Sequence, residues 1–189
     1  MKFTVENYIK QHNSVIEKLD YQEVENAISL IQEAVWLGKR VAVCGNGGSA
    51  LAASHFITDW NKMVFSHTGT RFNGICLSDN IGLVTAYAND LCYEDVFSEQ
   101  VKNLLNEGDL LITVSGSGNS ENVVRATNIA NEMKVKTLTI CGYDGGKLKR
   151  VSQNSVWIRS YDMQLCEDAH IAFGHMVMKS LCGEDLQID

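Results

Sequence analysis

The feature that most constrains this chain is a repeated change of texture along its sequence. Short, continuous apolar runs alternate with longer stretches of helical periodicity. Continuous apolar runs indicate strands that are buried on both faces, and strands that alternate with helices imply βαβ crossovers in a parallel sheet. The expected strands are 40–44, 72–77, 109–114, 136–141 and 155–158, and the expected helices are 49–62, 80–88, 93–105, 119–133 and 163–182. We therefore predict an α/β fold, a three-layer sandwich around a five-stranded parallel sheet.

The first 38 residues have a different pattern. Apolar residues recur there at helical spacing, for example at Val15, Leu19 and Val24. Such N-terminal helices either pack on a neighbouring subunit or lie on their own domain, and both readings stay open. No linker or low-complexity tract divides the chain, so we expect a single domain over 1–189, with 1–38 as a helical oligomerisation segment and 39–189 as the ligand-binding core.

Composition excludes some functions. The 189 residues carry a net charge of -7, which argues against non-specific nucleic-acid binding but allows a locally positive phosphate site. The N-terminal segment has no apolar signal-peptide core, and no apolar run approaches the ~18 residues of a membrane span. The six cysteines form no CxxC pair, and several lie in apolar runs. We expect a cytoplasmic protein with reduced thiols and no contact with membrane or nucleic acid.

Two polar loops follow predicted strands. The first, Gly45–Ala50 (GNGGSA), opens a predicted helix, and its glycines allow a tight turn and close approach to a ligand. It is neither a GxGxxG motif nor a Walker motif with its lysine. The second, Ser115–Ser120 (SGSGNS), has four polar residues in six at a helix start. Hydroxyls and backbone N–H groups there can hold a phosphate monoester, whereas a mere N-cap needs only Asn119 or Ser120.

Imidazoles and carboxylates recur on two predicted helices. His55 and Asp59 are four residues apart and share one helix face. Glu167 and His175 on the last helix differ by only ~80° in direction. These side chains can form a metal site that suits zinc or another divalent ion, or they can supply acid and base groups.

The ordered set of motifs resembles a known family. GNGGSA, the His55–Asp59 pair, TAYANDLCYEDVFSEQV (85–101), VSGSGNSENVVRA (114–126), GYDGGKL (142–148) and the ending from Glu167 to His175 resemble the sugar-isomerase (SIS) domain of phosphoheptose isomerases. The resemblance covers nearly the whole chain. It implies an aldose–ketose isomerase that converts sedoheptulose 7-phosphate to glycero-manno-heptose 7-phosphate, or that acts on a closely related phosphosugar. It also implies a homotetramer with active sites at subunit interfaces.

The resemblance also implies roles for individual residues. Asp59 and His175 would be catalytic, and a zinc ion would have four ligands: His55, Asp59, Glu167 and His175. Substrate and its phosphate would contact Asn46, Gly47, Gly48, Ser49, Asn89, Asp90, Ser115, Gly116, Ser117, Ser120 and Glu167. The chain departs from the family at three of these positions, with Asp59 for the usual Glu, Glu167 for Gln and Gly116 for Thr.

Isomerisation through an enediol needs a base at carbon, an acid at oxygen and stabilisation of the enediolate. We expect Asp59 to be the base and His175 its acid/base partner. The competing interpretation is a non-catalytic SIS-domain scaffold, related to a bacterial protein that associates with the replication initiator. Retention of His55, Asp59, Glu167 and His175 favours the enzyme. A third interpretation is a phosphosugar-sensing regulator. We do not favour it, because we see no DNA-binding segment in this sequence.

Overall fold

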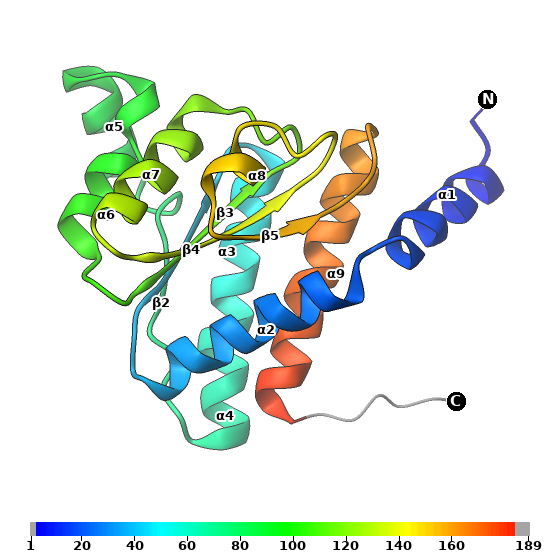
Figure 1. Ribbon diagram of the computed structural model, residues 1–189, viewed down its shortest axis with the longest axis horizontal. Helices are drawn as coiled ribbons and strands as arrows, with labels where there is room; N and C mark the ends of the chain where they lie inside the picture. The colour runs from blue at the N-terminus through cyan, green and yellow to red at the C-terminus, as the bar shows by residue number, and fades with distance from the viewer. Residues whose placement is uncertain (1–2, 184–189) are drawn as a thin grey trace.

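The computed structural model describes residues 3–183 of the chain, which contain five strands and the helices around them (Figure 1). The strands are β1 (Val41–Gly45), β2 (Gly74–Cys76), β3 (Leu110–Ser115), β4 (Lys136–Cys141) and β5 (Asn154–Trp157). The α-helices are α1 (Val5–Glu17), α2 (Tyr21–Trp36), α3 (Gly48–Asp59), α4 (Phe65–Thr68), α5 (Ile81–Asp90), α6 (Ser98–Leu104), α7 (Glu121–Glu132), α8 (Leu148–Val151) and α9 (Met163–Cys182). A π-helical turn, η1 (Trp60–Val64), and a 3₁₀ turn, η2 (Tyr93–Asp95), complete them.

The sheet confirms the predicted parallel architecture. Its strand order is β2-β1-β3-β4-β5, and each neighbouring pair is parallel. β1 and β3 are adjacent in register, with Gly45 opposite Val114, so the two polar loops leave the sheet side by side.

Helices cover both faces of the sheet, as a three-layer sandwich requires. One apolar cluster joins the sheet to α2, α3 and α9 through side chains such as Ile31, Phe56 and Phe173. The other joins it to α6 and α7 through Val101 and Val123, among others. The strands pack into apolar side chains on both sides, which is why their sequences read as continuous apolar runs.

Two predicted helices differ in detail. The helix expected over 49–62 continues through η1 and α4 to Thr68, and it ends at Gly69 with φ 72°, a left-handed C-cap. The helix expected over 93–105 is split into η2 and α6. Apolar periodicity does not distinguish a π or 3₁₀ turn from an α-helical one, because the change in backbone hydrogen bonding is local.

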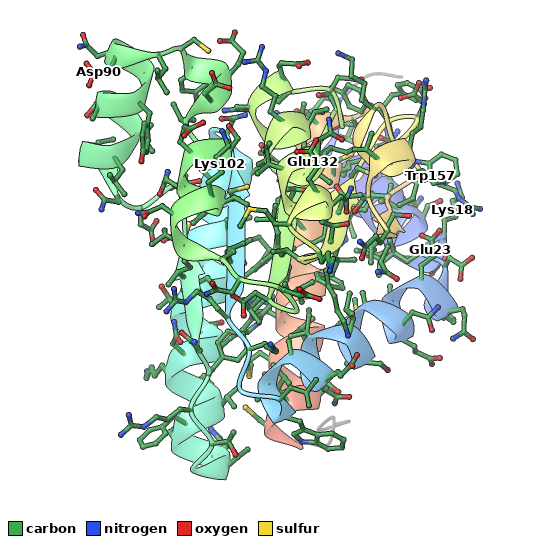
Figure 2. All side chains as sticks on the ribbon, turned by 60° about the vertical axis from the view of Figure 1, so that its left-hand side comes forward. Lys18, Glu23, Asp90, Lys102, Glu132 and Trp157 are labelled. Atoms are coloured by element: carbon green, nitrogen blue, oxygen red, sulfur yellow. The ribbon has the colours of Figure 1, made fainter. Side chains whose placement is uncertain are left out.

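The two N-terminal helices differ in how far they are buried against the rest of the chain. α2 lies on its own domain: Ala27 and Ile31 are buried, and the backbone N–H of Trp157 donates to Glu23 at 2.9 Å (Figure 2). α1 extends outward at its N-terminal end (Figure 1), where Val5 and Ile9 are 68% and 53% exposed, but it also contacts α9: the Tyr8 hydroxyl donates to Asp168 Oδ2 at 2.6 Å, and Val15 is buried. Residues 1–2 of this predicted segment lie outside the described range.

Candidate active site

The crevice between β1 and β3 holds a cavity of about 170 Å³. From β1 the chain adds β2 on one side of the sheet and then β3 on the other side. Open parallel sheets bind ligands at such a topological switch point. Asn46, Ser49, Val114, Ser115, Gly116, Ser117, Ser120, Met163 and Glu167 line the cavity. A larger cavity of about 320 Å³ between the C-terminal ends of α2 and α9 has a mostly apolar lining with none of the predicted site residues, so the smaller one is the candidate site.

The first loop turns through Gly47 directly into α3. Gly47 has φ 53° and ψ -123°, a conformation that a side chain would strain. Gly48 is then the first residue of α3, and Ser49 is buried in its first turn. The start of α3 therefore lies at the cavity, with its free N–H groups close by.

The second loop leaves its serines free of a capping role. Ser120 is the N-cap residue of α7, but its hydroxyl makes no capping hydrogen bond. Asn119 does not cap the helix either: its Nδ2 donates to the Ser117 carbonyl at 2.9 Å, and its Oδ1 accepts from the Lys147 backbone N–H at 3.1 Å. The N-cap reading of this loop is therefore not supported, and the cavity has hydroxyls on the β3 side as well as on the α3 side.

A second group of side chains lies further along α3 and α9. The Nε2 atoms of His55 and His175 are 3.0 Å apart, and Asp59 Oδ2 is 3.4 Å from the first and 3.9 Å from the second. Their ligand atoms all lie within 4.8 Å of one another. The sequence placed His55 and Asp59 on one face, but only the fold brings His175 to them.

Close packing of α3 on α9 produces this cluster. The two helices run side by side in the same direction (Figure 1). A Cβ on Gly174 would collide with the Phe56 ring, so a glycine is needed at the crossing next to His175. Trp60, in η1, stacks on Phe56 and donates its indole N–H to the Gly174 carbonyl at 3.0 Å.

Known proteins match this arrangement. The SIS domain family model matches residues 6–142. The chain is 35% identical over 193 residues to the phosphoheptose isomerase of Clostridium acetobutylicum, covering 97% of this chain and 98% of that one. It is 34% identical over 170 residues to that of Aliarcobacter butzleri, covering 90% and 89%. The chain belongs to the phosphoheptose isomerase family.

Solved structures agree with this membership. The phosphoheptose isomerase of Neisseria gonorrhoeae is 26% identical, with a TM-score of 0.86 over 94% of this chain and 96% of that one. The phosphoheptose isomerase of Francisella tularensis shares the fold, with a TM-score of 0.89 at 22% identity over 95% and 97%. The resemblance noted in the sequence is thereby confirmed.

Glu167 lies apart from the cluster in this member of the phosphoheptose isomerase family. Its carboxylate packs against Gly48 at the start of α3, where a Cβ would be 2.6 Å from Glu167 Cδ, and it lines the β1–β3 cavity. His175 is eight residues further along α9, about 12 Å along the axis. Helical side chains lean toward the N-terminus, so Glu167 leans away from His175. Within residues 3–183, three of the four predicted metal ligands come together.

Asn89 and Asp90 also lie away from the cavity. Both are exposed at the end of α5, where Asn89 Nδ2 donates to Asp90 Oδ1 at 2.8 Å. Figure 2 shows Asp90 at the outer end of this helix, on the opposite side of the molecule from Trp157. The pair is therefore not among the residues that line the cavity in this chain.

The sequence did not predict a role in the site for three residues near the cavity. Met163 lies over Gly116, where a Cβ would be 3.1 Å from Met163 Cε, so its thioether fills space that the family's usual Thr would need. Tyr93 and Asn122 hydrogen-bond to Asn46 at 2.8–2.9 Å. Tyr93 belongs to the motif 85–101, and Asn122 follows the serine loop, but neither spacing predicts a contact with Asn46.

One imidazole of α9 takes no part in either group. His170 is completely buried, and neither of its ring nitrogens has a hydrogen-bond partner among the described residues. Burial lowers the pKa of His170 to about 4, because the charged form loses its hydration. The side chain is therefore neutral at pH 7 and lies in the helix between the cavity residue Glu167 and the cluster residue His175.

Proposed function

We propose that this protein is an aldose–ketose isomerase that interconverts sedoheptulose 7-phosphate and glycero-manno-heptose 7-phosphate. The observation that carries the proposal is that one helix bears both halves of the site. Ser49 lines the cavity, and His55 follows about 9 Å further along α3, at 1.5 Å per residue. A ligand that uses both ends is extended, with an anion at one end and its reacting carbons at the other. Open-chain sugar phosphates have this form, and the relatives at 34–35% identity carry the name phosphoheptose isomerase.

The cavity would hold the phosphate without a lysine. Ser115, Ser117 and Ser120 supply hydroxyls, and the serine loop leads into the N-terminus of the 12-residue helix α7. Free backbone N–H groups and the helix dipole favour negative charge at that point. The phosphate then fixes the far end of the substrate and supplies binding energy.

The His–Asp cluster would move the proton. Asp59 takes the proton from the carbon next to the carbonyl, and His175 transfers a proton to or from the neighbouring oxygen. Reversing the two roles returns the proton to the adjacent carbon and completes the isomerisation. His55, at hydrogen-bond distance from His175, sets the orientation of that imidazole.

As an alternative use of the same atoms, the cluster would bind a divalent ion, most suitably zinc, and the ligand atoms would then not be free to carry protons. Two imidazole nitrogens and one carboxylate oxygen are the donor set that zinc prefers. His55, His175 and Asp59 would hold the ion, since their ligand atoms all lie within 4.8 Å of one another. When bound, the ion would polarise the sugar carbonyl and orient its hydroxyls. Metal analysis of the purified protein, repeated at falling pH, tests this proposal: affinity should drop as the histidines protonate. Full activity in chelator would leave the cluster as acid/base groups alone.

A homotetramer with sites at subunit interfaces would complete the arrangement. Phe3, just before α1, and Val5 and Ile9 on α1 are exposed, and Asn89 and Asp90 lie at the outer end of α5. Light scattering should give a particle of several subunits at micromolar concentration. A stable particle of 20.9 kDa would contradict the proposal.

The non-catalytic scaffold is not favoured. A scaffold does not need two imidazoles and a carboxylate that converge across two helices, as they do here. We also propose a cytoplasmic location, where sugar phosphates are metabolised. No described helix is long and apolar enough to cross a membrane.

A panel of sugar phosphates tests the proposed activity. The protein is incubated in D₂O with five-, six- and seven-carbon ketose and aldose phosphates, and NMR follows both the product and deuterium at the second carbon. Conversion of the heptose phosphates, with much slower conversion of the shorter sugars, supports the proposal. No exchange with any of them, in a protein that binds phosphate, would favour the scaffold.

A further inference from the structure

Asn46 is held by three hydrogen bonds at the edge of the cavity. Its Nδ2 donates to Asn122 Oδ1 at 2.8 Å, and its Oδ1 accepts from Asn122 Nδ2 at 2.9 Å and from the Tyr93 hydroxyl at 2.8 Å. A side-chain amide has two N–H donors and two acceptor positions. Both acceptor positions and one donor are therefore used, and a single N–H remains.

The direction of these bonds follows from a backbone group. Asn122 Oδ1 also accepts the backbone N–H of Val123 at 3.0 Å, and a backbone N–H can only donate. This bond fixes which end of the Asn122 amide is oxygen. The reciprocal pair then fixes the Asn46 amide, and the Tyr93 hydroxyl has to donate. Asn122 is 3% exposed, so its side chain is shielded from water, whereas the Tyr93 hydroxyl belongs to a half-exposed side chain.

We propose that Asn122 and Tyr93 are positioning residues, which hold the Asn46 amide so that its one unused N–H faces an oxygen of the bound phosphosugar. With the amide reversed, Asn46 would present its carbonyl oxygen to the cavity and repel the phosphate. The inference rests on the proposed function, since it assumes a phosphate ester in the cavity that Asn46 and the three serines line.

The turn that carries Tyr93 is attached to the same helix as Asn122. Arg125, one turn further along α7, forms an ion pair with Asp95 at 2.8 Å. Its hydrogen bond holds the pKa of the Asp95 carboxyl below its ordinary value, and Cys92 Sγ donates to that carboxylate at 3.1 Å. η2 and α7 therefore form one support for the Asn46 amide.

The test measures the binding of inorganic phosphate by calorimetry, and KM and kcat with the heptose phosphate. Tyr93→Phe removes one hydroxyl from a half-exposed side chain, so the variant should fold. Asn122→Asp keeps both accepting bonds and removes the donor to Asn46. Each should weaken phosphate binding by about 10-fold or more, because the Asn46 amide is then no longer held in place and its own hydrogen bond to the charged phosphate is lost. KM should rise by a similar factor while kcat changes little. Tyr21→Phe, on exposed Tyr21, and Asn128→Asp, on the exposed face of α7, are the matched controls and should change neither value.

Variants at Asn46 separate positioning from general structural damage. Asn46→Asp, which presents only oxygen, should bind phosphate more weakly than Asn46→Ala. In the Asn46→Ala background, Tyr93→Phe should have no further effect, because there is no amide left to orient. A full additional loss in that background, or no loss from Tyr93→Phe in the parent, would overturn the inference. So would a parent that binds no phosphate. If the couplings appear but no heptose phosphate reacts, the proposed activity fails and the positioning role stands.

Discussion

The cavity between β1 and β3 and the His–Asp cluster on α3 and α9 are built in different ways. Most of the cavity consists of backbone turns, hydroxyls and helix starts that directly follow neighbouring strands, and Met163 and Glu167 of α9 complete its lining. The cluster consists of side chains from two helices, and His55 and His175 are 120 residues apart in the chain. The first depends on local backbone geometry, and the second on how closely two helices pack. We therefore expect substitutions to separate binding from proton transfer.

The largest effect is expected at Asp59. Asp59→Asn keeps the shape of the side chain but cannot accept a proton at neutral pH, so isomerisation should fall by about 10²–10⁴-fold. Phosphate binding in the cavity should be unchanged, which serves as the internal control. Deuterium exchange at the second carbon of the sugar measures the effect. Exchange at the parent rate would exclude Asp59 as the base and make His175 the leading candidate.

A combination of variants refines this prediction. Asp59→Glu restores the residue that the family usually has at position 59, and Glu167→Gln restores the one that it usually has at position 167. If the two departures are coupled, the double variant should be more active than either single one. The 12 Å axial separation of Glu167 and His175 makes the opposite outcome informative. Additive effects would assign Glu167 to the cavity and Asp59 to the cluster, without coupling between them.

His170 should make the whole protein sensitive to acid. Its folded pKa of about 4 lies below the ordinary value of 6.5, so the unfolded chain binds the proton more tightly. The contribution of neutral His170 to the free energy of unfolding is fully present above pH 6.5. It is lost as pH falls toward 4, and the loss is on the order of 3 kcal/mol. His170→Leu should remove this part of the pH dependence of urea unfolding between pH 7 and 4. An unchanged slope would show that other groups determine the acid sensitivity.

Substitutions of the cavity serines test whether the cavity binds phosphate. Ser117→Ala and Ser120→Ala should each weaken phosphate binding by ~1.5–3 kcal/mol, because each removes one hydrogen bond to a charged group. The rate at saturating substrate should change much less than after Asp59→Asn. Ser66→Ala on α4, outside the cavity, is the control. Unchanged phosphate affinity in both cavity variants would contradict the phosphate assignment.

The smallest effect on stability, and the most selective one, is expected at Gly174. Gly174→Ala forces a methyl group against Phe56 and should cost ~1–3 kcal/mol as an overpacked contact. Because the crossing of α3 and α9 sets the cluster, deuterium exchange should fall while phosphate binding is preserved. Equal loss of both would mean that the two parts of the site do not respond separately.

The sequence by itself determined the fold class and the edge of the sheet at which the two polar loops lie. Buried parallel strands read as continuous apolar runs, and the polar loops that follow 40–44 and 109–114 had to emerge at one edge of the sheet. These consequences are local, because strand burial and loop position depend on residues adjacent in the chain.

Only the tertiary structure decided what meets across that edge. It brought His175 to His55 and Asp59, kept Glu167 at the start of α3, and joined Tyr93 and Asn122 to Asn46. Periodicity gives the face on which a side chain lies, but not the residue that it faces on another element. The distance between helices depends on single contacts, such as Gly174 against Phe56, and those exist only once the chain has packed.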